Sequence, residues 1–407
     1  MRRRAPLAVA LAAVWAVAAY VLWRSRVPDG LHLGGLDVRQ DFGAAAVARS
    51  RHFQSVELWL ELGSIFCQLA VLAVYTRWGA RWVRESAAGP VGTGMLLGML
   101  GLGFVWASQL PIGVVQVWWE RRYGVSKASY VTFAFAQWPQ LVGAFLSISL
   151  ALAIVMGLAR RLGQRWWIPG SAVFVAIALL YAFVTPWLAV GTHPLAQDSP
   201  KLAAAAAGLE RREGVAPTPV RVADISSQTS APNAFAAGFG PSRRIVVYDT
   251  LLDGRFTQRE VRVVLAHEIG HLARWHIWKS LGWYALFAVP GAFLIALVTR
   301  RRGGMGEPEA VPLALLTLVV LSLVALPARN AISRHLELEA DWQALQAARD
   351  PAAQRALFRA FVPATLSDPD PGTVEYLLFE DHPTLAQRVA LVAAWQRRYA
   401  AAPAQSP

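Results

Sequence analysis

Seven runs of apolar residues, each close to the length that crosses a bilayer, constrain the fold of this chain more than any other feature. A membrane-spanning helix needs about 20 mostly apolar residues, because backbone polar groups inside lipid must be paired within the segment. The predicted spans are 7–23, 58–75, 95–118, 141–159, 167–190, 281–298 and 311–326. We therefore predict a mainly α-helical, polytopic membrane protein with about seven transmembrane helices.

Four of these runs have features of their own. Arg2 to Arg4 precede the first run as in a signal peptide, but the run reaches Trp23 without a small-residue cleavage site, so we interpret it as a span. The last two runs contain or adjoin prolines, which is compatible with tilted or broken helices. In the third run, Gly94, Gly98, Gly101 and Gly103 are predicted to allow close helix packing.

Composition identifies the surroundings of the chain. It is 55% hydrophobic and 16% charged, with a net charge of +13. Such a charge suits nucleic-acid binding, but the arginines mostly flank the apolar runs, as anionic lipid headgroups favour. We expect the lipid bilayer as a partner, no nucleic acid, and a multi-pass location in the cell (plasma or inner) membrane. The single cysteine, Cys67, lies inside an apolar run, so thiolates cannot dominate a metal site.

Two segments do not follow the membrane pattern. Residues 1–191 are predicted to form a membrane region with five spans, and 278–327 to add two more. Residues 192–277 and 328–407 lie between and after them and are predicted to be two parts of one folded domain. Within the first part, the β-prone runs 220–225, 235–239 and 245–249 predict a small sheet.

The motif His267-Glu268-Ile269-Gly270-His271 follows this predicted sheet on a helix that begins at a capping box, 257–260. Residues four apart share one helix face roughly 5–6 Å apart, so His267 and His271 can direct two imidazoles at one ion. Glu268 beside them can hold a water and move its proton, while zinc lowers the pKa of that water towards about 7. The pattern also occurs by chance in unrelated proteins, but the capped, periodic helix favours a zinc site.

A catalytic zinc needs a third protein ligand and one open position. Glu337 is the predicted third ligand and His335 is its rival. Glu337 and Asp341 share a helix face whereas Glu339 points away, so Asp341 is predicted to accept the free ring N–H of a ligand histidine. The alternative is an exposed acidic helix balanced by Arg334, which leaves the metal without a third donor.

Span counting tests whether these segments can meet. Two predicted spans separate His271 from Glu337, and an even number returns the chain to the same side of the membrane. The same count places His382 on that side.

Together these segments resemble the membrane-bound zinc peptidases that include the type I CAAX prenyl endoprotease and the HtpX-type heat-shock protease, with the CAAX-type branch closer. The matching segments are Asn233-Ala234-Phe235, 244–252, the His-Glu-x-x-His helix and Ser-Arg-x-x-Glu-x-x-Ala-Asp at 333–341. The resemblance implies a gluzincin-like zinc peptidase domain that holds one zinc ion per chain. It implies His267, His271 and Glu337 as ligands and Glu268 as general base, in agreement with the spacing.

The resemblance also implies roles that the residues alone would not indicate. In the segment 382–388, which looks like the late His-Pro motif of the family, His382 and Arg388 are predicted to stabilise the oxyanion or hold the substrate. From the residues alone, they would be a loop histidine and a solvated arginine. Asn233 and Ala234 are predicted to lie on an edge strand that pairs with an extended substrate, with ordinary sheet core as the alternative.

Two segments depart from the family pattern. The Ser-His-x-Asn lead into the strand appears as 230–233, Ser-Ala-Pro-Asn, and the Glu-x-x-x-Gly-Phe-Asn loop appears as 120–126, Glu-Arg-Arg-Tyr-Gly-Val-Ser. Both lie outside the catalytic motifs. They bear on substrate preference, so the resemblance by itself does not establish cleavage of a prenylated C-terminal tripeptide.

We thus predict a zinc-dependent integral-membrane endopeptidase that acts on peptide or protein substrates delivered from the membrane or threaded into a chamber. One alternative is an HtpX-like quality-control protease. Another, from a different class, is a catalytically silent zinc-containing scaffold or transporter whose metal has four protein ligands. Glu57 and Glu61 either line such a chamber or lie at the membrane interface. The loop arginines marginally favour an external site, whereas the family precedent, which we follow, is a cytoplasmic one.

Overall fold

The computed structural model describes residues 4–79, 88–188 and 191–400, and long helices dominate it. Six helices in these ranges are long and apolar enough to cross a membrane, and a seventh apolar helix is shorter. The six are α3 (Ala44–Trp78), α4 (Gly89–Tyr123), α5 (Tyr130–Leu162), α6 (Trp167–Val184), α10 (His276–Thr299) and α11 (Val311–Ala348), and the shorter one is α1 (Arg4–Trp23). The predicted membrane fold is confirmed, although the end of the predicted span 167–190 lies outside the described residues.

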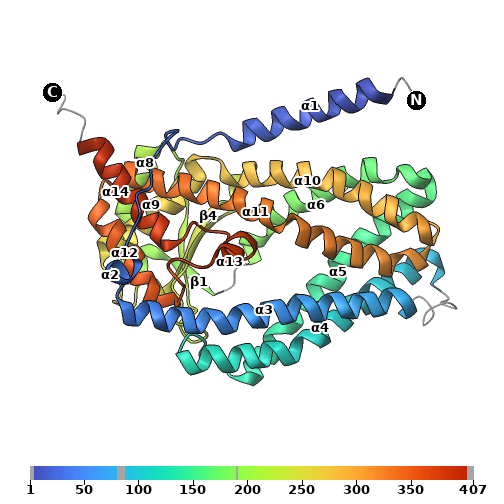
Figure 1. Cartoon of the computed structure of the whole chain (residues 1–407), viewed down its shortest axis with the longest axis horizontal. Coiled ribbons are helices and arrows are strands. Elements are labelled where there is room, and N and C mark those ends of the chain that lie inside the picture. The colour runs from blue at the N-terminus through green and yellow to red at the C-terminus, as the bar shows by residue number, and fades with distance from the viewer. Residues whose placement is uncertain (1–3, 80–87, 189–190, 401–407) are drawn as a thin grey trace.

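The remaining elements gather at one end of the long helices (Figure 1). They are α2 (Val38–Phe42), α7 (Leu195–Asp198), α8 (Pro200–Glu213), α9 (Gln258–Ala273), α12 (Pro351–Thr365), α13 (Thr373–Leu378), α14 (Leu385–Ala400) and four strands. Segments before and after α10 and α11 thus come together, as the span count requires. The division into 1–191, 192–277, 278–327 and 328–407 stays a prediction.

The small sheet has one more strand than the three β-prone runs predicted. Its order is β1 (Thr192–Pro194), β2 (Val220–Ala223), β4 (Arg244–Tyr248) and β3 (Ala234–Ala237). β2 and β4 are parallel, whereas β1 and β3 pair antiparallel with their neighbours. β1 was missed because three residues are too short for a period-two pattern. β3 is an edge strand of this sheet.

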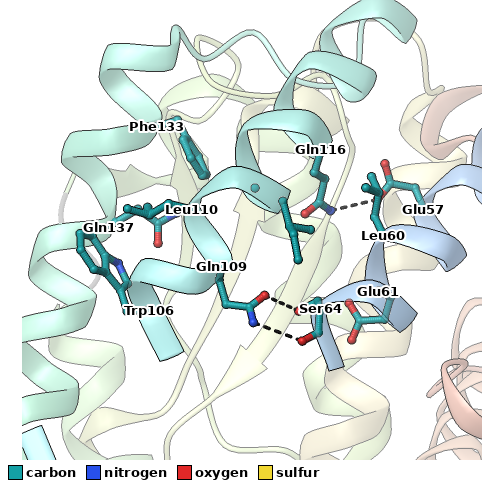
Figure 2. Close-up of a pocket in the computed structure, with 12 residues that line it drawn as sticks. Glu57, Leu60, Glu61, Ser64, Trp106, Gln109, Leu110, Gln116, Phe133 and Gln137 are labelled. Atoms are coloured by element: carbon teal, nitrogen blue, oxygen red, sulfur yellow. Dashed lines mark hydrogen bonds between the residues drawn. The ribbon is translucent and has the colours of Figure 1, made fainter. Parts of the chain in front are cut away.

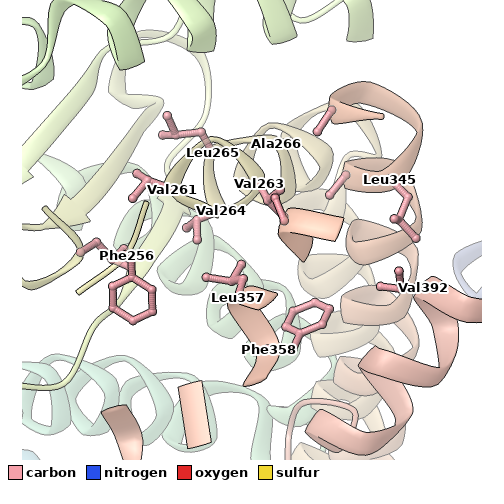
Figure 3. Close-up of a cluster of buried hydrophobic side chains, with 14 of the residues drawn as sticks. Phe256, Val261, Val263, Val264, Leu265, Ala266, Leu345, Leu357, Phe358 and Val392 are labelled. Carbon is pink, nitrogen blue, oxygen red and sulfur yellow. The ribbon is translucent and has the colours of Figure 1, made fainter. Parts of the chain in front are cut away.

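Apolar side chains hold α9 inside this end of the molecule. Val261, Val264 and Leu265 of α9 belong to one cluster with side chains of α8, the sheet, α11, α12 and α14. In Figure 3, Val264 points towards Leu357 of α12, and Leu265 points to the opposite side of α9. Leu265 is 0% exposed. Fully burying such a side chain contributes about 1.5–3 kcal/mol. Residues 263–270 of α9 are all buried, so the helix that carries the His-Glu-x-x-His motif is packed on every side along this stretch.

α11 joins two segments that the sequence suggested were separate. The predicted span 311–326 and the helical segment that carries Glu337 form one helix of 38 residues, Val311–Ala348, with Pro327 inside it. Proline removes one backbone hydrogen bond, but helices in membranes tolerate it where neighbours satisfy the freed group. Glu337 therefore lies on a direct continuation of a membrane helix.

A small polar cavity lies between α3, α4 and α5 (Figure 2). Its volume is about 180 Å³, and Glu57 and Glu61 both line it. Glu57 Oε2 accepts a hydrogen bond of 2.9 Å from Gln116 Nε2, and Gln109 Nε2 donates to the Ser64 carbonyl oxygen at 3.2 Å. Both glutamates thus face a cavity within the helix bundle.

Glycines of α4 set the distance between the membrane helices. A methyl group on Gly101 would lie 2.6 Å from Leu315 Cδ1 and 2.9 Å from Tyr75 Cε1. Tyr75 is 1% exposed and donates its hydroxyl to the Leu97 carbonyl oxygen at 2.7 Å. Close packing is confirmed at Gly94, Gly98 and Gly101, whereas a methyl group on Gly103 meets only Phe145 Cζ at 3.8 Å.

We expect Gly101→Ala to destabilise the protein by about 1–3 kcal/mol, because the added methyl group overpacks a site where a hydrogen-bonded ring cannot move freely. Thermal unfolding in detergent should show a lower transition temperature for this variant. Gly103→Ala is the matched control on the same helix and should leave the transition unchanged or slightly higher, since alanine favours helix. Equal effects of the two substitutions would contradict the packing assignment.

Candidate metal centre

α9 begins as the capping box predicts. Thr257 is the N-cap: its hydroxyl accepts from the Glu260 N–H at 3.3 Å, and Glu260 Oε2 accepts from the Thr257 N–H at 2.7 Å. α9 runs from Gln258 to Ala273, so His267, Glu268 and His271 lie on its last two turns. These bonds satisfy N–H groups that the helix itself cannot pair.

Three side chains from α9 and α11 converge on one point. His267 Nε2 lies 3.0 Å from His271 Nε2 and 3.1 Å from Glu337 Oε2, and His271 Nε2 lies 3.5 Å from Glu337 Oε1. Within the described ranges, these three form the group whose ligand atoms all lie within 4.8 Å of one another. Two imidazoles and one carboxylate match the donor set of catalytic zinc sites.

His335, the rival ligand, lies elsewhere. Its ring stacks on Trp23 with centroids 4.1 Å apart, and its Nε2 lies 2.7 Å from the Trp23 carbonyl oxygen. It therefore joins the end of α1 to α11.

The electrostatics of the group fit a bound cation. Glu337 Oε2 is buried and makes no hydrogen bond of acceptable geometry, although His267 Nε2 is 3.1 Å away. Burial lowers the pKa of His267, but the hydrogen bond to Asp341 and the negative charges of Asp341 and Glu337 outweigh it and raise the pKa to about 10. The site thus favours positive charge at the point where the lone pairs of the three side chains meet.

Asp341 supports His267 from behind. Its Oδ1 lies 2.9 Å from His267 Nδ1, the arrangement predicted for the free ring N–H of a metal-binding histidine. Arg388 donates to both Asp341 oxygens, from Nε and Nη2, at 2.7 Å each. The guanidinium also lies over the Phe358 ring, 4.3 Å from its centroid. Arg388 therefore fixes Asp341, and its predicted contact with oxyanion or substrate stays a prediction.

Glu268 and His382 face the same region from two sides. Glu268 Oε2 accepts a hydrogen bond of 2.8 Å from the N–H of Ala236 on the edge strand β3. His382 Nε2 lies 3.3 Å from Glu337 Oε2, while its Nδ1 lies 2.7 Å from Asp381 Oδ1. The structure thus brings the general-base candidate and the predicted oxyanion residue to the converging ligands.

A large cavity opens at this centre. Its volume is about 820 Å³, and Asn233 and Ala234, the predicted substrate-binding residues, lie on its wall with Glu268. The cavity extends between α10 and α11 as far as Phe287 and Ser322. It therefore connects the metal centre with the level of the membrane helices.

The interpretation of 333–341 as an exposed acidic helix is wrong. Glu339 and Asp341 are 0% and 1% exposed, and the side chain of Glu337 is 12% exposed. Arg334, the proposed balancing charge, instead donates to the carbonyl oxygens of Tyr376 and Glu380. These carboxylates are interior groups.

Sequence reasoning missed His276. Its Nδ1 lies 2.8 Å from His271 Nδ1 and its Nε2 lies 3.1 Å from Glu339 Oε2. Five residues separate it from His271, which on a continuous helix would place it on a different face. Trp275, with a φ of 59°, breaks the helix between them, and that turn has no clear signal in the sequence.

Comparisons with known proteins agree with this geometry. The model of Peptidase family M48 matches residues 196–396. A "Protease HtpX homolog" from Kineococcus radiotolerans is 30% identical over 279 residues, which cover 61% of this chain and 89% of that protein. The chain belongs to peptidase family M48. It is an integral-membrane metallopeptidase, so its substrates are peptides or proteins, and the resemblance seen in the sequence is confirmed.

Other M48-like proteins show the breadth of the similarity. A "Protease HtpX homolog" from Acidiphilium cryptum is 29% identical over 283 residues, covering 62% of this chain and 95% of that protein. The "Uncharacterized metalloprotease YhfN" of Bacillus subtilis is 26% identical, and the match covers 66% of this chain and 65% of that protein. The crystal structure of Ste24p from S. mikatae has the same fold, with a TM-score of 0.71 and 21% identity over 93% of this chain and 96% of that one.

The two segments of this M48 chain that depart from the CAAX-type pattern lie against each other. The Ser230 N–H donates to the Val125 carbonyl oxygen at 2.8 Å, and the Lys127 N–H donates to the Gln228 carbonyl oxygen at 2.8 Å. Ser126 and Thr229 form an antiparallel bridge. The departures therefore form one local surface that leads into β3.

We expect Glu337→Gln to lose its metal, because an amide carries no charge to hold a dication with only two imidazoles left. Metal content of the purified protein, measured by atomic emission, should fall from about one ion per chain to a small fraction of that value. His335→Gln on the same helix is the matched control and should keep the metal. Retention by Glu337→Gln with loss by His335→Gln would reverse the ligand assignment.

Proposed function

We propose that this chain is a zinc-dependent endopeptidase of the cell membrane, with one zinc ion held by His267, His271 and Glu337. The observation that carries the proposal is the convergence of these three side chains, with Glu268 beside them, on the wall of a cavity that an edge strand also lines. A donor set of three leaves a coordination position open. That supports a catalytic site over a silent structural one, which would take four protein ligands.

Glu268 acts as the general base. Its Oε2 is held by the Ala236 N–H at 2.8 Å, which fixes the carboxylate against β3. Zinc at this site supplies a Lewis acid that lowers the pKa of water to about 7. Glu268 takes the proton of the attacking water and then gives it to the departing amine.

His382 stabilises the oxyanion. Its side chain is 50% exposed on the cavity, and the bond of Nδ1 with Asp381 directs Nε2 towards Glu337. A donor fixed in advance near developing negative charge lowers the barrier without reorganisation. Arg388 is held by Asp341, so in this proposal it contributes mainly by fixing that carboxylate and, through it, His267.

β3 binds the substrate in extended form. The Asn233 carbonyl oxygen accepts from the Tyr248 N–H on β4, and backbone groups alternate in direction along a strand. The N–H and C=O groups of Ala234 and Ala236 therefore point away from β4, and both residues line the cavity. Glu268 occupies the Ala236 N–H. The remaining outward groups are available to a substrate backbone by strand addition.

In this proposal, substrate choice follows from the position and lining of the cavity. The cavity reaches between α10 and α11, which favours polypeptides presented at or within the membrane. Sequence relatives carry the name protease HtpX, whereas the similar solved structure is Ste24p. We place the catalytic face in the cytoplasm, where quality-control substrates or membrane-anchored C-terminal segments would reach it.

Glu268→Gln should abolish cleavage and keep zinc, because the amide preserves the shape of the side chain and cannot take a proton. We expect cleavage of a fluorogenic peptide to fall by about 10²–10⁴-fold, with metal content unchanged. Glu260→Gln, a carboxylate of the same helix at its capping box, is the control and should cleave normally once folded. Persistent cleavage by Glu268→Gln would show that another group acts as the base.

Strand addition predicts an alternating effect of backbone N-methylation in the substrate. Methylating an amide that pairs with β3 removes one hydrogen bond, so KM should rise by about 2–10-fold, whereas methylating the next amide should have little effect. A series of peptides methylated one position at a time would measure this. A smooth dependence on position would exclude pairing with an edge strand.

A further inference from the structure

His276 lies against the metal centre although it is outside the His-Glu-x-x-His motif. It is the first residue of α10 and is 3% exposed. Trp275 before it has a φ of 59°, a left-handed conformation that bulky residues adopt only at a cost of about 1–2 kcal/mol. This turn brings the His276 ring back onto His271, with ring centroids 4.8 Å apart and the two Nδ1 atoms 2.8 Å apart.

Glu339 lies next to His276, on the side away from His271, and four hydrogen-bond donor groups surround its carboxylate. Its Oε1 accepts from the Arg26 N–H at 2.8 Å and from Arg274 Nε at 3.3 Å. Its Oε2 accepts from Lys279 Nζ at 2.6 Å and lies 3.1 Å from His276 Nε2. A carboxylate has about four acceptor sites, so a fully buried one with four such neighbours is an ionised acceptor. Nε2 of His276 must therefore carry the hydrogen of the fourth bond.

This assignment fixes the tautomers of both histidines. Because a neutral imidazole has one donor and one acceptor nitrogen, the Nδ1 of His276 is an acceptor. The hydrogen between the two facing Nδ1 atoms then belongs to His271, and its Nε2 keeps the lone pair. Nε2 is the atom that faces His267 and Glu337. The network thus leaves His271 in the form that binds a metal.

We propose that His276 and Glu339 are positioning residues that hold His271 in its metal-binding tautomer and orientation, a role that rests on the metal centre proposed above. They do for His271 what Asp341 does for His267. The difference is that the carboxylate acts through a second imidazole. We call the connected groups Glu339, His276 and His271 the relay. Glu339 also accepts from the Arg26 N–H, and Lys279 donates to the Arg24 carbonyl oxygen at 2.9 Å, so hydrogen bonds join the relay to the segment that follows α1.

Glu339→Gln tests the carboxylate. The amide keeps the shape but has only one oxygen, which the Arg26 N–H and Arg274 Nε require because both can only donate. Its NH₂ group then faces His276 Nε2, which favours the opposite tautomer of His276 and turns its Nδ1 into a donor. His271 must then accept at Nδ1 and carry its hydrogen on Nε2, so it loses its lone pair for the metal. We expect the Zn²⁺ affinity of the full chain in detergent to fall by about 10–100-fold, measured by competition with a chelator of known affinity. Glu210→Gln, which alters a carboxylate of α8 that is 5% exposed and accepts from the Thr218 N–H, is the matched control and should leave this affinity unchanged.

A pair of variants at His276 tests whether its Nδ1 is the acceptor for His271. The Asn oxygen can still accept from His271 Nδ1–H, whereas Leu cannot, so His276→Asn should keep Zn²⁺ affinity within about 3-fold and His276→Leu should lose about 10-fold or more. The visible absorption of Co²⁺ bound in place of Zn²⁺ should change in His276→Leu and Glu339→Gln and stay close to that of the parent in His276→Asn. Equal losses in His276→Asn and His276→Leu, or unchanged affinity and spectra in all three variants, would overturn the proposal.

Lys279→Met separates positioning from folding stability. It removes one donor from Glu339 and leaves the contact of Glu339 with His276, so we expect a lower unfolding temperature with Zn²⁺ affinity within about 3-fold of the parent. A loss of affinity as large as that of Glu339→Gln would mean that the cluster acts through stability alone and would contradict the relay. None of these measurements uses cleavage. A chain that binds Zn²⁺ through the relay but cleaves no peptide would contradict the proposed function and leave this inference standing.

Discussion

Three carboxylates within five residues of α11 are taken out of water, and the need to pair each of them organises the centre of this protein. An unpaired buried charge costs several kcal/mol, so Glu337, Glu339 and Asp341 can be interior only if cations or donors reach every one. Asp341 is bound by Arg388 and His267, and Glu339 by Lys279, Arg274 and His276. Glu337 faces imidazoles alone, and one of its oxygens is left without a well-formed hydrogen bond. In the proposed site, the metal ion supplies the missing charge at that point.

Much of the centre could be predicted because its residues follow regular helix geometry. His267 and His271 are four residues apart, and so are Glu337 and Asp341, so each pair was placed correctly on one helix face. The count of spans then brought the two helices to one side of the membrane. A contact of Asp341 with one of the ligand histidines followed from its helix face and the chemistry of histidine ligands, and the structure shows that this histidine is His267. Where spacing on a helix decides, the sequence is sufficient.

The other features of the centre depend on where helices continue or break, and the sequence carries little signal for either. The sequence separated the span 311–326 from the segment that begins at residue 328, yet α11 continues through Pro327 from one to the other. Trp275 gave no hint of a turn, yet its left-handed backbone places His276 against His271. Helix spacing correctly directed Glu339 away from the face of Glu337 and Asp341, but it could not show that this opposite face is also buried. The partners of Glu339 come from α10, from the turn between α9 and α10, and from the segment after α1. All are far away in sequence, and no local pattern reveals them.

The position of the sequence departures bears on how such a centre can change its substrate without losing its chemistry. Segments 120–126 and 230–233 are far apart in the chain, but hydrogen bonds join them directly before β3. β3 contacts Glu268 through the Ala236 N–H, and Ala234 of the same strand lines the cavity. In the proposed function, the paired loops therefore adjoin the strand that binds substrate, whereas the three proposed ligands lie on α9 and α11. Because the loops for substrate recognition are separate from the helices that hold the metal ligands, the loops can vary in sequence. The helices are constrained by the buried charges that they carry.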